Sequence, residues 1–168
     1  MSRGVRSAIT ISVLVVILAV AAVWGWSAAT EPLPAKVDTP ICSPRTVAAG
    51  DKVYPQDVTV SVYNAGTREG LAGRVMKSFT DDGFAEGNSG NAPSGSKVPV
   101  VSIWTTEPQN PAVLLVASRL GGNVDIERRS GVGAGVTVVV GDGFTTLAKG
   151  RNSVVATQDA QVCSPPVA

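Results

Sequence analysis

Histidine is absent from this 168-residue chain, and cysteine occurs only twice. The commonest general base near neutral pH and the commonest metal-binding side chain are therefore both missing. Two cysteines without histidine also supply too few ligands for a zinc site. Since no nucleophile stands at a useful spacing from a base, we expect no catalytic residue, no metal and no cofactor, and we predict that the chain is not an enzyme.

Charged residues are scarce as well, and their two signs nearly balance. Once Arg3 and Arg6 are set aside, 12 basic residues stand against 13 acidic ones. Binding to nucleic acid requires a surplus of basic side chains gathered on one face. We therefore expect no nucleic-acid partner. The length leaves room for one modest domain with appendages.

The longest stretch without charge, residues 8–26, is predicted to be a transmembrane helix. As a helix it would span roughly 28 Å, which is close to the ~30 Å hydrocarbon core of a bilayer. Trp24 and Trp26 lie at its end, where indole rings favour the headgroup region. Arg3 and Arg6 precede it and predict a cytoplasmic N-terminus, so that everything after the helix lies outside the cell membrane.

A cleaved signal peptide is the alternative interpretation of the same segment. Ser27, Ala28 and Ala29 would then be the small residues of the cleavage site. The apolar core of a signal peptide is usually shorter, at about 7–15 residues. The length therefore favours a retained single-pass anchor.

Residues 27–56 change character and are predicted to be an extracytoplasmic spacer. Few apolar residues cluster there, and prolines interrupt any helix. These prolines are Pro32, Pro34, Pro40, Pro44 and Pro55. An unstructured stalk is a likelier meaning of such a composition than a binding segment, although Val53 and Tyr54 could form a short edge contact.

The folded part is organised around residues 58–84. Alternating valines from Val58 to Val62 predict a half-buried strand, and a turn with Asn64, Gly66 and Gly70 follows it. Apolar residues then recur at the spacing of a helix, which Gly83 ends in a left-handed conformation. These apolar residues are Leu71, Ala72, Val75, Met76 and Phe79.

The remaining segments predict a second helix over residues 111–120, with Asn110 as its N-cap, Pro111 at its first position and Gly121 as its stop. Further predicted elements are strands at 84–91, 98–105, 124–126 and 136–140, a helical turn at 144–147 and an edge strand at 153–157. The order is β-α-β-β-α-β with one extra strand. We predict an α+β two-layer sandwich of the split β-α-β type, with both helices on one face of the sheet and one transmembrane helix before it.

The predicted domain organisation has five parts. They are a cytoplasmic N-terminus at 1–7, the transmembrane helix at 8–26, the spacer at 27–56, the folded domain at 57–150, and a C-terminal tail at 151–168 that contains Cys163.

Four motifs together resemble the LytR C-terminal domain family over roughly residues 57–145. They are VSVYNAGTREGLAGRV at 60–75, Asp-Gly-Phe at 82–84, Gly-Asn-Ala-Pro at 90–93, and VTVVVGDGF at 136–144. The motifs are moderately specific as a set and weak singly.

The resemblance implies an envelope protein at the outer face of an actinobacterial or other Gram-positive membrane. Members of the family stand alone or follow a LytR-CpsA-Psr phosphotransferase domain, and no stretch of this sequence is long enough to hold that enzyme. This chain resembles the stand-alone, membrane-anchored members linked to cell-envelope integrity. The family has no established catalytic residue that could be carried over to this sequence.

The two cysteines, Cys42 and Cys163, lie on either side of the predicted sandwich, each within Cys-Ser-Pro. In an oxidising exterior such a pair usually forms a disulfide. An intramolecular bond would tie the spacer to the tail, and we favour it. An intermolecular bond or two free thiols remain open as alternatives.

The turn between the first strand and the first helix is a candidate anion site. Backbone amides at Asn64, Gly66 and Gly70 could hold a phosphate, and Arg68 could add a bidentate contact. The spacing matches neither a dinucleotide-binding loop nor a Walker A loop, and a plain tight turn is the favoured interpretation. The glycines of residues 130–135 lead into a strand, which is the wrong context for a nucleotide loop.

Basic residues could also form a patch for an anionic envelope polymer, although charges of this kind more often form a solvated face. The candidate ligand-binding residues are Asn64, Gly66, Arg68, Gly70, Arg74, Arg128 and Arg129, with Lys77 as a further basic residue. Carboxylates are expected to be surface charges that alanine can replace at little cost, with glycoside chemistry at Asp125 and Glu127 as a remote alternative. These carboxylates are Asp81, Asp82, Asp125, Glu127 and Asp142.

Together these observations predict a membrane-anchored, extracytoplasmic module without catalytic activity. It would support the cell envelope by binding a wall polymer or an envelope protein. The alternative is an enzyme or carrier that acts on a lipid-linked phosphate or a wall polymer. The sequence does not identify the ligand, the partner or the oligomeric state.

Overall fold

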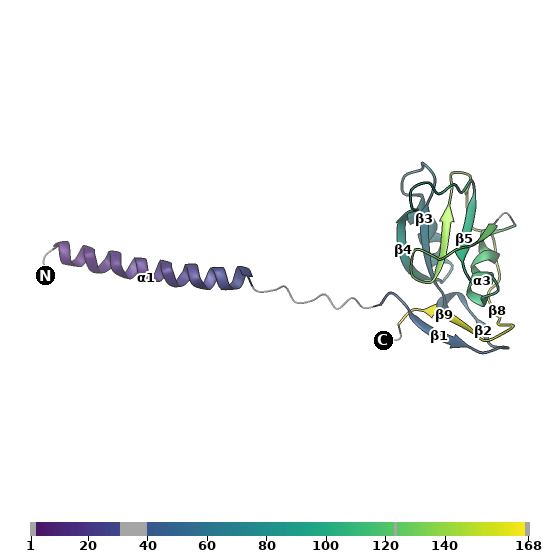
Figure 1. Cartoon of the computed structure of the whole chain (residues 1–168), viewed down its shortest axis with the longest axis horizontal. Helices are drawn as coiled ribbons and strands as arrows, with labels where there is room; N and C mark the ends of the chain where they lie inside the picture. Colours follow the sequence, from purple (N-terminus) through teal and green to yellow (C-terminus); the bar gives the residue numbers. More distant parts are fainter. Residues whose placement is uncertain (1–2, 31–39, 123, 167–168) are drawn as a thin grey trace. The chain divides into compact units, whose positions relative to one another are not determined.

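The computed structural model describes residues 3–30, 40–122 and 124–166, and the chain forms two compact units (Figure 1). The first unit comprises residues 1–39 and the second comprises residues 40–168.

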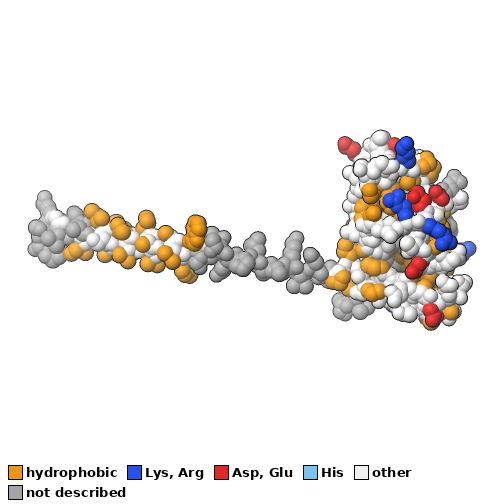
Figure 2. All heavy atoms as spheres, in the orientation of Figure 1, with side chains coloured by type: hydrophobic (Ala, Val, Ile, Leu, Met, Phe, Trp, Pro, Cys, Tyr) orange, Lys and Arg blue, Asp and Glu red, His pale blue; other side chains and the backbone are white. Residues whose placement is uncertain are grey.

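The first unit contains one long helix, α1 (Arg3–Thr30). Its segment from Ile9 to Trp26 is long and apolar enough to cross a membrane, and in the part of the chain that the structure describes it is the one helix of that kind. All side chains of this segment are exposed, and Figure 2 shows apolar side chains on it with no charged ones between them. The helix continues to Thr30, four residues past Trp26, where the predicted transmembrane helix ends.

The second unit is built on a five-stranded sheet with the order β4-β3-β7-β5-β6. Its strands are β3 (Thr59–Asn64), β4 (Ala85–Asn91), β5 (Val101–Thr105), β6 (Val124–Arg128) and β7 (Val136–Val140). Strand β3 is parallel to β4 and β7, β5 is parallel to β6, and β5 is antiparallel to β7. All five residues of β7 are buried, which explains their continuous run of β-branched side chains.

The fold is α+β, as predicted, but the predicted split β-α-β arrangement is wrong. Strands β3 and β4 are joined by α2 (Leu71–Asp81) and are direct neighbours, and so are β5 and β6, which are joined by α3 (Pro111–Leu120). The last strand, β7, lies between the two β-α-β units and forms the centre of the sheet. The sequence order of the elements does not determine where a final strand is inserted, because that choice depends on long-range packing.

Both helices contribute to one hydrophobic core on the same face of the sheet. Phe79 of α2 is fully buried and meets Phe84 edge to face, with ring centroids 5.3 Å apart. As predicted, Asn110 is the N-cap of α3 and accepts a hydrogen bond from the amide of Ala112. Gly83 has a φ of 90°, the left-handed conformation expected at the end of α2.

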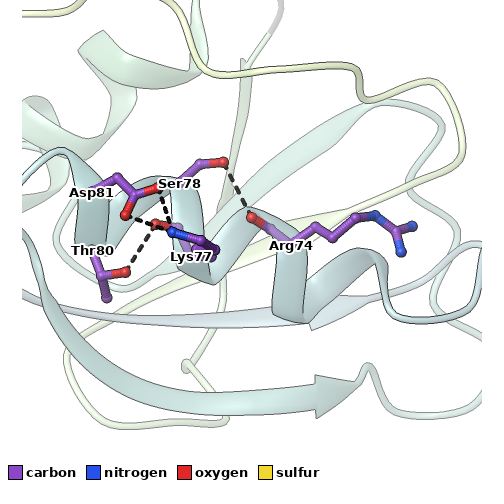
Figure 3. A network of polar contacts seen from close by, with 5 residues as sticks. All are labelled: Arg74, Lys77, Ser78, Thr80 and Asp81. Carbon is purple, nitrogen blue, oxygen red and sulfur yellow. Dashed lines mark hydrogen bonds and ion pairs between the residues drawn. The ribbon is translucent and has the colours of Figure 1, made fainter.

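The outward face of α2 carries a local polar network (Figure 3). Lys77 donates to both carboxylate oxygens of Asp81 at 2.9 Å, and the Ser78 hydroxyl donates to the backbone carbonyl of Arg74. The Thr80 hydroxyl donates to the carbonyl of Lys77. This exposed pairing fits the solvated face that the sequence favoured over a binding patch.

Four further strands, the terminal strands, lie at one end of the second unit (Figure 1). Strand β1 (Ser43–Val47) pairs with β9 (Ala160–Ser164), and β2 (Lys52–Val53) pairs with β8 (Val154–Val155). A short 3-10 helix, η1 (Pro55–Asp57), leads from β2 into β3. A disulfide joins Cys42 to Cys163, with Cα atoms 5.4 Å apart, so the structure contains the intramolecular bond that the sequence favoured.

The compact unit thus extends beyond the predicted domain at 57–150, since the paired strands β1, β2, β8 and β9 lie on either side of that segment. The terminal strands add Val47, Val53, Val154 and Val162 to the main core, and Ala156, directly after β8, is buried in it as well. The terminal strands are short, and β1 contains Pro44. In the sequence, their isolated buried residues therefore resemble a spacer or a tail. The predicted helical turn at 144–147 is also absent, although the Phe144 side chain is buried. Residues 31–39 of the predicted spacer lie outside the described residues.

Candidate functional site

The turn after β3 is held by its own side chains. Asn64 donates from its amide nitrogen to the carbonyl of Arg68 at 2.8 Å, and its amide oxygen accepts from the backbone of Gly66 at 2.9 Å. Gly70 then adopts a left-handed φ of 67° directly before α2. These contacts close the loop that the sequence marked as a candidate anion site.

The carboxylate of Asp142, in the loop after β7, occupies this turn. Its oxygens accept from the backbone amides of Thr67 at 2.8 Å and Arg68 at 3.1 Å, and also from the hydroxyl of Thr67 at 3.1 Å. The pKa of Asp142 is lowered, first by the hydrogen bond from the Thr67 amide and then by that from the Arg68 amide, against an opposing effect of desolvation. The turn is thus an anion-binding turn whose anion belongs to the same chain.

The side chain of Arg68 reinforces this link between the β3 and β7 ends. Its guanidinium donates to the carbonyl of Phe144 at 2.8 Å and to that of Asp142 at 3.3 Å. A β-carbon at Gly66 would lie 2.6 Å from the carboxyl carbon of Asp142, so the glycine is needed for space. The geometry therefore favours the structural interpretation of the turn over the ligand-binding one.

The predicted basic residues do not converge on one patch. Arg68 follows the carboxyl end of β3, which pairs with the carboxyl end of β7 through Asn64 and Val140. Because β5 and β6 run antiparallel to β7, Arg128 at the end of β6 and the adjacent Arg129 lie at the end of the sheet opposite to Arg68. Arg74 lies on the outward face of α2, where its guanidinium extends away from the Lys77 network (Figure 3).

Arg129 is engaged on the sheet face that does not carry the helices. Its guanidinium lies 3.8 Å from the centre of the Trp104 ring, a cation–π contact, and 3.8 Å from a carboxylate oxygen of Glu127. Glu127 also accepts from the hydroxyl of Ser102 at 3.1 Å. On the face of the second unit seen in Figure 2, basic and acidic side chains are interspersed rather than gathered by sign.

Arg128 has a different environment, because it lines a groove beside the start of α3. Two adjoining cavities, of about 240 Å³ and 620 Å³, share Glu107, Asn110 and Gln161 as lining residues. We call the two cavities together the α3 groove. The cavity of about 240 Å³ is the inner part of the groove, and the cavity of about 620 Å³ is its outer part.

The inner part of the α3 groove is lined mainly by uncharged polar and apolar groups. Thr59 from the start of β3 and Trp104 from the end of β5 contribute to it, together with Cys163 of β9. The Thr59 side-chain oxygen and the Trp104 indole nitrogen are both buried and have no hydrogen-bond partner among the described residues. These atoms are the polar groups of the cavity lining that the fold itself leaves unsatisfied.

The outer part of the groove is lined by more charge, with Arg128 and Asp159 as well as the shared Glu107. One basic and two acidic side chains make this part slightly acidic. Asp159 is partly engaged, because it accepts a hydrogen bond from the backbone amide of Ala49 at 2.9 Å.

Asn110 holds the two walls of the groove together. Its amide nitrogen donates to the carbonyl of Gln161 at 2.8 Å and to the carboxylate of Glu107 at 3.1 Å, while its oxygen caps α3. One wall thus comes from the central sheet and α3, and the other from the terminal strand β9. Sequence reasoning identified Asn110 as a helix cap but not Thr59, Trp104 or Gln161, because the groove depends on β9 packing beside α3.

Within the described ranges, no three residues among cysteine, aspartate and glutamate gather closely enough to hold a metal ion. The exposed carboxylates are dispersed over separate elements, and Asp82 forms an ion pair with the largely buried Arg119 at 3.2 Å. The chemistry available in the groove is hydrogen bonding and apolar contact, with charge at its mouth.

Comparison with known proteins adds a family match. The sequence profile described as LytR cell envelope-related transcriptional attenuator matches residues 57–144, slightly more than half of the chain. A structural comparison finds similarity to the soluble domain of a conserved hypothetical secreted protein from Mycobacterium marinum, at 23% identity and a TM-score of 0.43. That alignment covers 61% of this chain and 68% of the other. A comparison with curated proteins gives no match.

Proposed function

The chain belongs to the LytR cell envelope-related transcriptional attenuator family, and on this premise we propose that it is a membrane-anchored module at the outer face of the cell membrane. In this role it supports the integrity of the envelope by binding a wall component or an envelope protein. It performs no chemistry on that partner.

The observation that carries the proposal is that the uncharged segment Ile9–Trp26 of α1 is followed by a disulfide-closed domain. Disulfides persist outside the reducing cytoplasm, so the bond between Cys42 and Cys163 supports an extracytoplasmic second unit. Arg3 and Arg6 on the other side of the apolar segment support a cytoplasmic N-terminus. A retained α1 would keep the domain at the membrane surface.

The proposal of a binding role without turnover is supported by the carboxylates. Asp142 is held by backbone amides and Asp82 by Arg119, so both carboxylates serve the fold. Asp125 and Glu127 alternate on the edge strand β6, where Glu127 contacts Ser102 and Arg129. None of these carboxylates lines the α3 groove.

The test is complementation of a strain that lacks the gene, with survival under envelope-directed antibiotics and detergent as the readout. Wild-type protein should restore survival, and so should the single variants D81A, D125A and E127A. A variant without α1 should fail, because the domain is no longer held at the membrane.

Each variant must be shown to be folded and membrane-bound before its phenotype is interpreted. If one of these three carboxylate variants is folded and localised but fails to complement, its carboxylate has a catalytic role. The proposal of a non-catalytic module would then be rejected in favour of an enzyme or carrier that acts on a wall precursor.

A further inference from the structure

The α3 groove has features of a binding site that the fold does not explain. Thr59 and Trp104 line its inner part, and the Thr59 hydroxyl and the Trp104 indole nitrogen are buried and have no partner among the described residues. Buried polar atoms in proteins nearly always have a hydrogen-bond partner. Two such atoms in the lining of one cavity therefore point to a ligand with polar groups of its own.

We propose that the α3 groove binds an uncharged saccharide chain, with one sugar unit in the inner part and adjacent units along the outer part. This assignment rests on the proposed function, because it names the class of wall component that the module recognises. The two cavities, of about 240 Å³ and 620 Å³, together reach the size range of ligand sites in proteins.

The hydrogen-bonding chemistry of the inner part suits hydroxyl groups. An indole nitrogen can only donate, whereas the Thr59 hydroxyl can donate and accept. A sugar hydroxyl can both donate and accept, so neighbouring hydroxyls on one ring can satisfy both groups. Val113 and Val136 line the same cavity and offer apolar contact to the carbon–hydrogen face of a ring.

The charges of the groove argue against an anionic polymer. Among the described residues, no basic side chain lines the inner part, and Glu107 is the one charged residue there. In the outer part Arg128 is outnumbered by Glu107 and Asp159. A phosphate-bearing or uronic-acid polymer would meet a slightly acidic surface, whereas a neutral polymer would meet no charge penalty of this kind.

The terminal strands make the site dependent on the disulfide. Gln161 and Cys163 form part of the inner wall, and Asn110 ties Gln161 to α3. Residues 160–164 lie outside the segment that matches the family. The groove therefore combines the family domain with a feature of this chain's own ends.

The experiment uses the full-length protein in detergent, with Trp24 and Trp26 replaced by phenylalanine so that Trp104 is the remaining tryptophan. The probes are wall glycans released by mild acid hydrolysis and separated by anion exchange into a neutral and an anionic pool. Saturable change of Trp104 fluorescence with the neutral pool, and none with the anionic pool, is the expected result.

Two matched substitutions locate the binding site. The Thr59→Val variant removes a buried, unpartnered hydroxyl from the groove lining, and should weaken binding by about tenfold, the effect expected for one hydrogen bond. The Thr137→Val variant removes another buried, unpartnered hydroxyl that does not line the groove, and should leave the affinity unchanged. Both replacements keep the shape of the side chain, and thermal melting checks that both variants are folded.

Three results would overturn the assignment. They are no saturable change with the neutral pool, equal affinities for the Thr59→Val and Thr137→Val variants, or displacement of the neutral glycan by the anionic pool or by a wall peptide. If any of these results is obtained while the wild-type protein still complements the deletion strain, the saccharide groove is rejected and the proposed function stands. Failure of the wild-type protein to complement would reject the proposed function itself.

Discussion

At the scale of single residues, the contact between Asp142 and the turn after β3 is the most consequential. It joins two loops that are 75 residues apart in the sequence through hydrogen bonds to the amides of Thr67 and Arg68. The sequence favoured a plain tight turn here, with an anion site as the alternative, and could not show that a carboxylate of the same chain occupies the turn. The local motif indicates an anion-binding turn, whereas the partner comes from a distant loop brought near by β-strand pairing.

The first prediction concerns the substitution Asp142→Ala. It should lower the melting temperature clearly, because the backbone amides of Thr67 and Arg68 lose the carboxylate that accepts their hydrogen bonds. Asp81→Ala is the matched control, since Asp81 has only an exposed pairing with Lys77, and should change stability by at most about 0.5 kcal/mol. Equal melting temperatures for the two variants would contradict a structural role of Asp142.

The stability that Asp142 provides should depend on pH. Its pKa in the folded chain lies below the ordinary value of 3.8, chiefly because of the hydrogen bond from the Thr67 amide. A lowered folded pKa gives stabilisation that is complete above the unfolded value and is lost as the pH falls through the folded value. Urea unfolding from about pH 6 to about pH 2 should show the wild-type advantage over Asp142→Ala shrinking at the acidic end. An advantage that stays constant over this range would exclude the charged carboxylate as its source.

Two glycines give an opposed pair of predictions. Gly66→Ala should destabilise the domain, because the new β-carbon would lie 2.6 Å from the Asp142 carboxyl carbon and 2.8 Å from its backbone nitrogen. Gly73→Ala, at an open position of α2, should stabilise it by about 0.5–1 kcal/mol through helix propensity. Chemical denaturation of both variants measures the difference, and a neutral Gly66→Ala would show that the turn can separate from Asp142.

At the scale of elements, local patterns predicted what is local. The alternation around Val60 predicted β3, the apolar stripe ending at Phe79 predicted α2, and Asn110 with Pro111 predicted the start of α3. The neighbours of each strand could not be predicted, since the position of β7 between β3 and β5 follows from burial of all its valines. Among the terminal strands, β8 lies within the predicted edge strand at 153–157 and β2 includes Val53 of the predicted edge contact, whereas β1 and β9 were not predicted.

The terminal strands should be required for a stable fold. Val47, Val53, Val154 and Val162 belong to the main core, and a buried valine contributes about 1.5–3 kcal/mol. Their combined loss is comparable with the net stability of a typical domain, about 5–15 kcal/mol. A chain restricted to residues 57–144 should therefore lack the cooperative melting transition that we expect for residues 40–168. A cooperative transition in the shorter chain would show that the family segment folds without its terminal strands.

The disulfide should stabilise the same region. In the chain-entropy model a closed loop of 121 residues is worth about 4–5 kcal/mol. The double replacement of Cys42 and Cys163 by serine should cost less than this, because the pairing of β1 with β9 and the contact of Ser164 with the Asp57 carbonyl remain. Thermal melting with and without reductant measures the loss for the wild-type protein, and the serine variant should not respond to reductant. A wild-type protein equally indifferent to reductant would contradict the role of the bond.

At the scale of the whole molecule, an apolar helical segment precedes a disulfide-closed domain, for which we propose binding without catalysis. Composition alone excluded much, since a chain without histidine and with balanced charge is a poor candidate for a metalloenzyme or a nucleic-acid binder. The position of the proposed binding site could not be predicted from the sequence. The residues of the α3 groove come from β3, β5, α3 and β9, and the predicted basic residues lie at opposite ends of the sheet.

The most direct test of the central claim is the location of the second unit in living cells. Intact cells are treated with a membrane-impermeant, amine-reactive reagent, after which membranes are isolated and the modified lysines are mapped by mass spectrometry. Lys77, which is 74% exposed, should be modified in intact cells, on a chain that remains in the membrane fraction with α1 attached. Modification of Lys77 only after the cells are permeabilised, or recovery from the medium of a chain cleaved near Ser27, would contradict an anchored module at the outer face.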